Sequence, residues 1–185
     1  MLKEHFDKYI SELMLSLRTI PFDKVELIVQ ILLDVHKTGK HVYVMGNGGS
    51  AATASHFVCD LAKGTKIEGK KPFKVTSLND NIPLLTAWSN DLSYETVFKS
   101  QLEDILEEGD LVIAFTGSGN SPNILRALEY SMSVGAKTIA FTGFNGGKVK
   151  ELADVCLIVN SDNMERIEDI HLVLEHLIKL YLKKN

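Results

Sequence analysis

The stretch that decides the fold is HVYVMGNGGSAATASHFVCDLAKGT, which runs from His41 to Thr65. Residues 41–45 form a short apolar run that predicts a buried strand, and the glycine-rich turn GNGGSA follows it at residues 46–51. A helix is expected to start at Ser50. Strand, glycine turn and helix N-terminus together bind anions well, because free backbone N–H groups point at the ligand. We expect the rest of the chain to hold this loop and to face it with a second one.

Length and composition favour an ordinary globular protein. The chain has 185 residues and a formal net charge of −4, which argues against non-specific nucleic-acid binding as its main task. A single domain is expected over residues 1–185, with two helices in 1–39 and an α/β core plus a terminal helix in 40–185. Cys59 and Cys156 lie far apart and give neither a disulfide framework nor metal-ligand spacing, so a reducing, cytoplasmic location is expected. No secretory signal or membrane span is predicted.

Strands and helices are predicted to alternate along the chain. Besides 41–45, strands are expected at 74–78, 110–115, 137–142 and 154–159. Helices are expected at 1–17, 23–39, from Ser50, from Asn81 to Asp91, and at 94–106, 121–134, 147–153 and 166–183. This order predicts a doubly wound, mostly parallel α/β sheet flanked by helices. Right-handed crossovers then bring the carboxyl ends of the strands, with their glycine loops, to one edge of the sheet.

A second loop of the same kind, TGSGNS, follows the strand at 110–115 and occupies residues 116–121. Either loop alone is weak evidence, since small-residue turns often serve only as connections. Two of them at the same edge favour a ligand site. The first loop lacks the lysine of a P-loop, and neither loop matches the dinucleotide pattern, so a sugar phosphate is the better candidate. We place the phosphate at the second loop, because it has more hydroxyl donors.

Five segments carry a resemblance to a known family. They are GNGGSAATASHF (46–57), TAWSND (86–91), FTGSGNSPNILRAL (115–128), TGFNGGKVKELADV (142–155) and RIEDIHLVLEHL (166–177). In combination they resemble the sugar isomerase (SIS) domain, and more closely the phosphoheptose isomerases, which convert sedoheptulose 7-phosphate to D-glycero-D-manno-heptose 7-phosphate. The resemblance covers nearly the whole chain. It implies a homotetramer with sites at subunit interfaces, and a dependence on zinc.

Ionisable side chains suggest where such chemistry would lie. His56, Asp60 and Lys63 are spaced to share one helix face, while Glu168 and His176 lie on the last predicted helix. Two histidines and two carboxylates suit a divalent cation. In the resembled enzymes the position of His56 is a zinc ligand, and that of Asp60 is a glutamate that binds metal and acts as acid–base. The position of Glu168 is a glutamine that touches metal and substrate, and that of His176 is a ligand that also transfers protons.

The chain departs from the family at two of these positions. Asp60 is one methylene shorter than the expected glutamate, and Glu168 carries a charge where an amide is expected. A base displaced by about an ångström can cost on the order of 100-fold in rate. An altered substrate, an altered metal and weak activity therefore all remain open.

The expected substrate contacts come from both loops and from the resemblance. They are Asn47, Gly48, Gly49, Ser50, Asp60, Asn90, Asp91, Thr116, Gly117, Ser118, Ser121 and Glu168. Lys63 is as well explained by solvent exposure as by a phosphate contact. His171 is expected to face either the helix bundle or the site, and Trp88 is expected in the core.

The reaction that these residues favour is aldose–ketose isomerisation of a phosphorylated sugar through a cis-enediol. Asp60 and His176 are the expected proton carriers, and zinc held by His56, Asp60, Glu168 and His176 would polarise the carbonyl. Two non-catalytic alternatives remain: a sugar-phosphate sensor, and a SIS protein like the DiaA type that binds the bacterial replication initiator. The presence of both histidines and two acids favours the enzyme.

Overall fold

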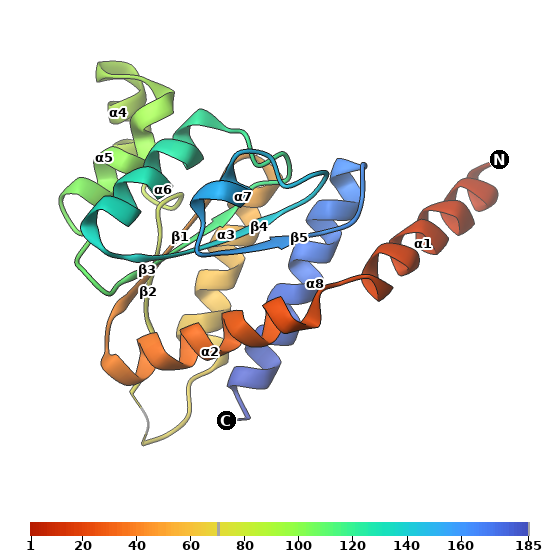
Figure 1. Cartoon of the computed structure of the whole chain (residues 1–185), viewed down its shortest axis with the longest axis horizontal. Coiled ribbons are helices and arrows are strands. Elements are labelled where there is room, and N and C mark those ends of the chain that lie inside the picture. Colours follow the sequence, from red (N-terminus) through yellow and green to blue (C-terminus); the bar gives the residue numbers. More distant parts are fainter. Residues whose placement is uncertain (70, 185) are drawn as a thin grey trace.

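The computed structural model describes residues 1–69 and 71–184, and Figure 1 shows the arrangement of its elements. In chain order these are α1 (Leu2–Arg18), α2 (Phe22–Thr38), β1 (His41–Gly46), α3 (Gly49–Cys59), the π-helical turn η1 (Asp60–Gly64), β2 (Lys74–Ser77), α4 (Ile82–Asp91), the 3-10 turn η2 (Tyr94–Thr96), α5 (Val97–Glu103), β3 (Leu111–Phe115), α6 (Pro122–Val134), β4 (Lys137–Thr142), α7 (Val149–Leu152), β5 (Val155–Ile158) and α8 (Met164–Leu182).

The five strands form one parallel sheet in the order β2-β1-β3-β4-β5. The predicted doubly wound α/β fold is therefore confirmed. The chain passes from β1 to β2 on one side and continues from β3 on the other, so the strand order reverses between β1 and β3. Ligands of open α/β sheets bind at such a switch point, outside the carboxyl ends of the strands. The two glycine loops follow β1 and β3 and so lie at this point.

Helices cover both faces of the sheet. Residues of α2, α3 and α8 pack with one set of strand side chains, and residues of α5, α6 and α7 pack with the other. The central strand β3 is buried along its whole length, because Ile113 faces the first core while Val112 and Ala114 face the second. A strand between two helical layers is expected to read as a continuous apolar run.

Two helices extend from this body. α1 points away from it in Figure 1, and its Phe6 and Met14 are 56% and 46% exposed. Polar contacts hold α1 to the rest: Tyr9 donates a hydrogen bond to Asp169 at 2.5 Å, and Ser16 donates one to the carbonyl of Asn160 at 2.9 Å. α4 has no buried residue within its described length. Its tryptophan, Trp88, is only half-buried against the second core, not inside it as the sequence suggested.

Several element boundaries differ from those predicted. α2 begins at Phe22, one residue earlier than predicted and without a side-chain cap, and it ends at Thr38, before Gly39, whose φ of 70° is left-handed. The predicted helix at 94–106 divides into η2 and α5. In the part of the chain that the structure describes, no helix has both the length and the apolar character needed to cross a membrane.

Candidate functional site

A cavity of about 260 Å³ lies between the two glycine loops and the start of α8. Its lining includes most of the residues that the sequence assigned to substrate binding: Asn47, Gly48, Gly49, Ser50, Thr116, Gly117, Ser118, Ser121 and Glu168. Phe115 and Met164, which the sequence did not single out, complete it. The switch point of the sheet thus holds a preformed pocket, at the place where open α/β sheets bind their ligands.

Amide side chains fix the two loops to one another. Asn47 and Asn123 exchange two hydrogen bonds of 2.9 Å, and Tyr94 donates a third to the Asn47 side-chain oxygen at 2.8 Å. Asn79 pairs in the same reciprocal way with the backbone of Gly46, which anchors the end of β1. No local pattern in the sequence singles out Asn123, because its partner lies 76 positions away.

Glu168 projects from α8 against the N-terminus of α3. A Cβ atom added to Gly49 would lie 2.4 Å from the Glu168 Oε2 atom, so the carboxylate fills the space that a side chain would need. Burial, helped by the charges of Glu165 and Asp169, raises the pKa of Glu168. An internal carboxylate therefore already faces the helix N-terminus of the first loop.

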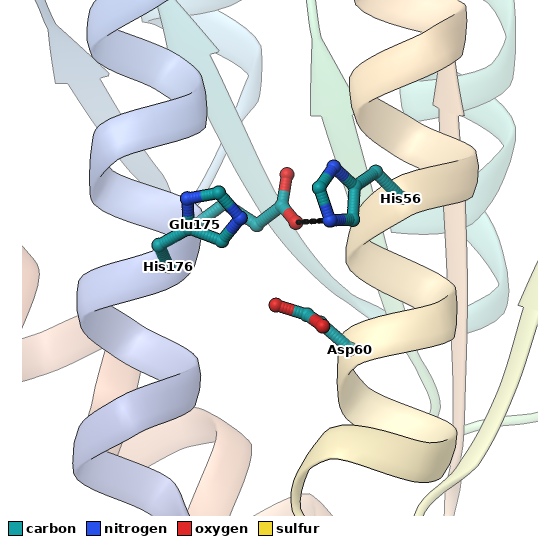
Figure 2. A group of neighbouring side chains, drawn as sticks. All are labelled: His56, Asp60, Glu175 and His176. Carbon is teal, nitrogen blue, oxygen red and sulfur yellow. Dashed lines mark ion pairs between the residues drawn. The ribbon is translucent and has the colours of Figure 1, made fainter.

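Further along the same two helices, four ionisable side chains converge from α3–η1 and α8 (Figure 2). His56, Asp60, Glu175 and His176 each offer a ligand atom within 4.8 Å of the others. The His56 and His176 rings meet edge to face, with centroids 5.0 Å apart. The structure therefore brings together three of the four predicted metal ligands. Glu168 stands outside this group, and Glu175, which the sequence did not single out, joins it.

Glu175 is completely buried, and neither of its carboxylate oxygens has a hydrogen-bond partner among the described residues. Its nearest ionic neighbour is His56, with 3.9 Å between Nε2 and Oε1. Burial and the charge of Asp60 raise the pKa of Glu175 to about 8, although Lys179 acts in the opposite direction. A buried carboxylate without a partner is energetically costly and calls for an explanation.

Asp60 opens the π-helical turn that ends α3. Its Oδ2 atom lies 3.5 Å from the Nζ atom of Lys179, one turn after Glu175 on α8. Gly64 makes room for this lysine, because a Cβ there would come within 2.6 Å of the Lys179 Cε atom. Lys63, the lysine favoured by helical spacing, is exposed. The lysine beside Asp60 is thus Lys179, from the facing helix.

The donors of this cluster suit a metal ion. Zinc takes imidazole nitrogen and carboxylate oxygen as ligands, usually four in a tetrahedral arrangement. The cluster supplies two of each, from His56, Asp60, Glu175 and His176. The Asp60 Oδ2 atom, like both oxygens of Glu175, is buried and lacks a hydrogen-bond partner in the described residues. Such unsatisfied acceptors are what a cation would coordinate, so the residues fit a zinc ion.

Asn90 and Asp91 do not line the cavity. Both are exposed at the end of α4, where the Asn90 amide donates a hydrogen bond to the Asp91 carboxylate at 2.9 Å. The protomer alone therefore does not unite these two residues with the other predicted substrate contacts.

His171 faces the helix–sheet core and not the cluster, which resolves the two alternatives left by the sequence. It is 1% exposed and lies beside the rings of Phe115 and Phe141. Its Nε2 atom donates a 3.3 Å hydrogen bond to the carbonyl of Thr142. Burial lowers the pKa of His171 to about 4.

Acid is expected to destabilise the protein through His171. The unfolded chain takes up a proton near pH 6.5, but the folded chain resists it until about pH 4. The contribution of His171 to the free energy of unfolding is therefore fully present above pH 6.5. It is lost as the pH falls toward 4, which lowers the free energy of unfolding by roughly 3 kcal/mol at about 1.4 kcal/mol per pH unit. Urea unfolding at several pH values measures this slope. His171→Leu should flatten it and His5→Gln, on exposed α1, should not; equal slopes in all three proteins would contradict the assignment.

Comparison with known proteins gives a consistent result. The SIS-domain family matches residues 5–143. The phosphoheptose isomerase of Aquifex aeolicus is 41% identical over 161 residues, covering 83% of this chain and 84% of that protein. That of a Geobacter species (strain M21) is 36% identical over 180 residues, covering 94% and 93%. The solved structure of the phosphoheptose isomerase from Neisseria gonorrhoeae superposes with a TM-score of 0.92 at 25% identity, over 100% of both chains.

The switch-point pocket and the domain match define the class: the chain is a SIS domain. Within that class it belongs to the phosphoheptose isomerase family, because relatives of that name exceed one-third identity over most of their own length. The resemblance read from the sequence motifs is thereby confirmed.

Proposed function

We propose that this chain isomerises sedoheptulose 7-phosphate to D-glycero-D-manno-heptose 7-phosphate. The observation that carries the proposal is the convergence of Asp60 and His176 in one ionisable cluster, on α3–η1 and α8, the helices whose N-terminal residues line the loop pocket, in a chain whose relatives are phosphoheptose isomerases. A proton acceptor and a proton donor on facing helices are what an aldose–ketose isomerisation needs.

The reaction moves two pairs of protons. One proton leaves C1 of the ketose while the C2 oxygen gains one, which gives a cis-enediol. A proton then joins C2 while the C1 oxygen loses one, which gives the aldose. Asp60, with a buried oxygen that lacks a hydrogen-bond partner in the described chain, and the ring nitrogen of His176 are the groups we assign to these transfers. Both side chains are partly shielded from water, which strengthens their electrostatic effect on the reacting atoms.

Zinc is the cofactor that we propose, held by His56, Asp60 and His176 with a further ligand from α8. When bound, it would polarise the sugar carbonyl and stabilise negative charge on the enediol oxygens. The remaining tasks belong to the protein: the two loops hold and orient the sugar phosphate, and Asp60 and His176 handle the protons.

The phosphate group is proposed to bind at the second loop. Thr116, Ser118 and Ser121 line the pocket there and offer hydroxyl donors. The N-terminus of α3 is the alternative anion site, but the Glu168 carboxylate already faces it and would repel a phosphate. Asn47, Gly48 and Ser50 are then left for the sugar chain.

A homotetramer with sites shared between subunits is part of the proposal. Asn90 and Asp91 lie outside their own protomer's pocket, and the apolar residues of α1 and α4 are exposed. Association through these helices would cover that apolar surface and allow α4 to reach a neighbouring site. Light scattering measures the assembly directly.

Turnover is the direct test. Purified protein, with and without added zinc, is incubated with sedoheptulose 7-phosphate and the aldose product is followed. Product formation that a chelator stops and zinc restores is the expected result. Binding without product under both conditions would oppose the proposal and favour a sugar-phosphate sensor.

Glu168→Gln is expected to lower KM for the sugar phosphate several-fold with little change in kcat. The carboxylate lines the pocket, and its negative charge opposes that of the phosphate, so an isosteric amide should relieve the repulsion. Steady-state kinetics at low ionic strength measure the effect. Glu165→Gln, an exposed carboxylate one turn earlier on α8, is the matched control and should leave KM unchanged. A KM that stays the same in both variants would contradict the assigned role of Glu168.

A further inference from the structure

Glu175 is a buried acid whose position the fold itself does not require. Its neighbours on the inner face of α8, Leu174 and Ile178, are apolar and complete the core in the usual way. Glu175 lies among them with no exposed surface, and both its oxygens lack hydrogen-bond partners in the described chain. A leucine at this position would avoid the cost of burying the carboxylate. The acid therefore points to a ligand.

The spacing of its neighbours suits a shared ion better than a direct bond. The 3.9 Å between Glu175 Oε1 and His56 Nε2 is too long for a hydrogen bond. Two atoms bound to one tetrahedral zinc ion, each at about 2.0–2.1 Å, lie roughly 3.4 Å apart. The Asp60 and His176 donor atoms fall within the same 4.8 Å group. Small side-chain movements would bring all four into coordination range.

We propose that Glu175 is the fourth protein ligand of the cation held by His56, Asp60 and His176. The inference rests on the metal site of the proposed function and deepens it. Glu168, the fourth ligand suggested by the sequence, lies seven residues earlier on α8, which is about 10 Å along the helix axis. Its carboxylate lies at the loop pocket beside Gly49. Glu175 would therefore bind the metal, and Glu168 would face the substrate.

Charge balance supports the same assignment. Two carboxylates and two neutral imidazoles would neutralise a divalent ion completely, which suits a site whose deepest ligand, Glu175, is fully buried. In the described chain the two carboxylates have one lysine ammonium close to them, that of Lys179 at 3.5 Å from the Asp60 Oδ2 atom. Asp60 has a short side chain, and the longer side chain of Glu175 enters the same cluster from the facing helix α8.

The test compares metal binding by two isosteric variants, Glu175→Gln and Glu168→Gln. Metal-free protein is titrated with Zn²⁺ in competition with a chromophoric chelator, and the visible spectrum of bound Co²⁺ reports the ligand set. Glu175→Gln should weaken zinc binding by about 100-fold or more and alter the Co²⁺ bands. Glu168→Gln should change zinc affinity by less than about threefold and leave the bands unchanged.

A third variant checks that the effect is not unfolding. Glu175→Leu should melt at a higher temperature than the wild type in the presence of EDTA, because a buried unpaired acid has been removed. It should also lose most of the zinc-induced rise in melting temperature that the wild type shows. A loss of zinc binding in a protein that is more stable without metal is the signature of a ligand.

Three outcomes separate this inference from the proposed activity. If Glu175→Gln binds zinc as tightly as wild type while His56→Ala does not, Glu175 is not a ligand and the inference is overturned. If the wild type binds no zinc yet isomerises sedoheptulose 7-phosphate, the inference fails and the activity stands. If zinc binding depends on Glu175 but no turnover occurs, the inference stands and the proposed function fails.

Discussion

His176→Ala is expected to lower kcat/KM for sedoheptulose 7-phosphate by about a thousandfold, within the range of general acid–base catalysis. His176 reaches the ionisable cluster from α8, and its ring meets that of His56 edge to face. Its removal would take away both the proposed proton carrier and a proposed metal ligand. The side chain is only partly buried, so the fold should survive its loss. Steady-state kinetics and circular dichroism measure the two effects.

Two controls make this experiment specific. His5→Ala, on exposed α1 away from the cluster, should keep wild-type turnover. Added imidazole should restore part of the activity of His176→Ala if the ring carries protons, and metal analysis of the same sample reports how much zinc it retains. A folded His176→Ala protein with kcat/KM within tenfold of wild type would remove His176 from the mechanism.

Gly119→Ala is expected to destabilise the protein by about 3 kcal/mol or more, which lowers Tm by roughly 6–12 °C. Gly119 has a φ of +66° in the second loop, and a Cβ there would lie 2.2 Å from the carbonyl oxygen of Gly146. The clash is with backbone, so no side-chain rotation relieves it. The loop after β3 and the loop after β4 would have to separate.

Gly39→Ala is the matched control for that substitution. Gly39 has nearly the same φ, +70°, but a Cβ at that position meets nothing within 4 Å. Its replacement should cost only the left-handed strain, about 1 kcal/mol. Urea unfolding separates the two costs, and calorimetry with sedoheptulose 7-phosphate should show weaker binding only for Gly119→Ala. Equal destabilisation by both variants would mean that the close approach to Gly146 carries no energy.

The sheet and its loops could be predicted because their signals are local. Apolar runs such as 111–115, bounded by turn residues, mark buried strands, and alternation with helices leaves few parallel topologies. Glycine turns directly after two of these strands then locate the ligand pocket. Apolar runs and turn residues are local signals, so a single sequence is enough to detect them.

The fourth member of the ionisable cluster could not be predicted, because helix packing decides it. Spacing on α8 associated Glu168 with His176, but the crossing of α3 over α8 selects Glu175 instead. The π-helical turn from Asp60 to Gly64 also changes the angular position of the residues that follow. Lys63, for which the sequence left solvent exposure and a phosphate contact equally open, is exposed. Contacts between segments more than 100 residues apart leave no periodic signal.

The exposed face of α1 has a thermodynamic consequence. A 17-residue helix in water is only marginally stable when its apolar side lacks cover, and Phe6, Ile10 and Met14 are all exposed in the single protomer. In the homotetramer proposed above, the helical order of α1 would be coupled to self-association, so dilution should fray this helix before the sheet responds. The melting temperature should accordingly rise with protein concentration, and amide exchange in α1 should report how much of the protein is assembled.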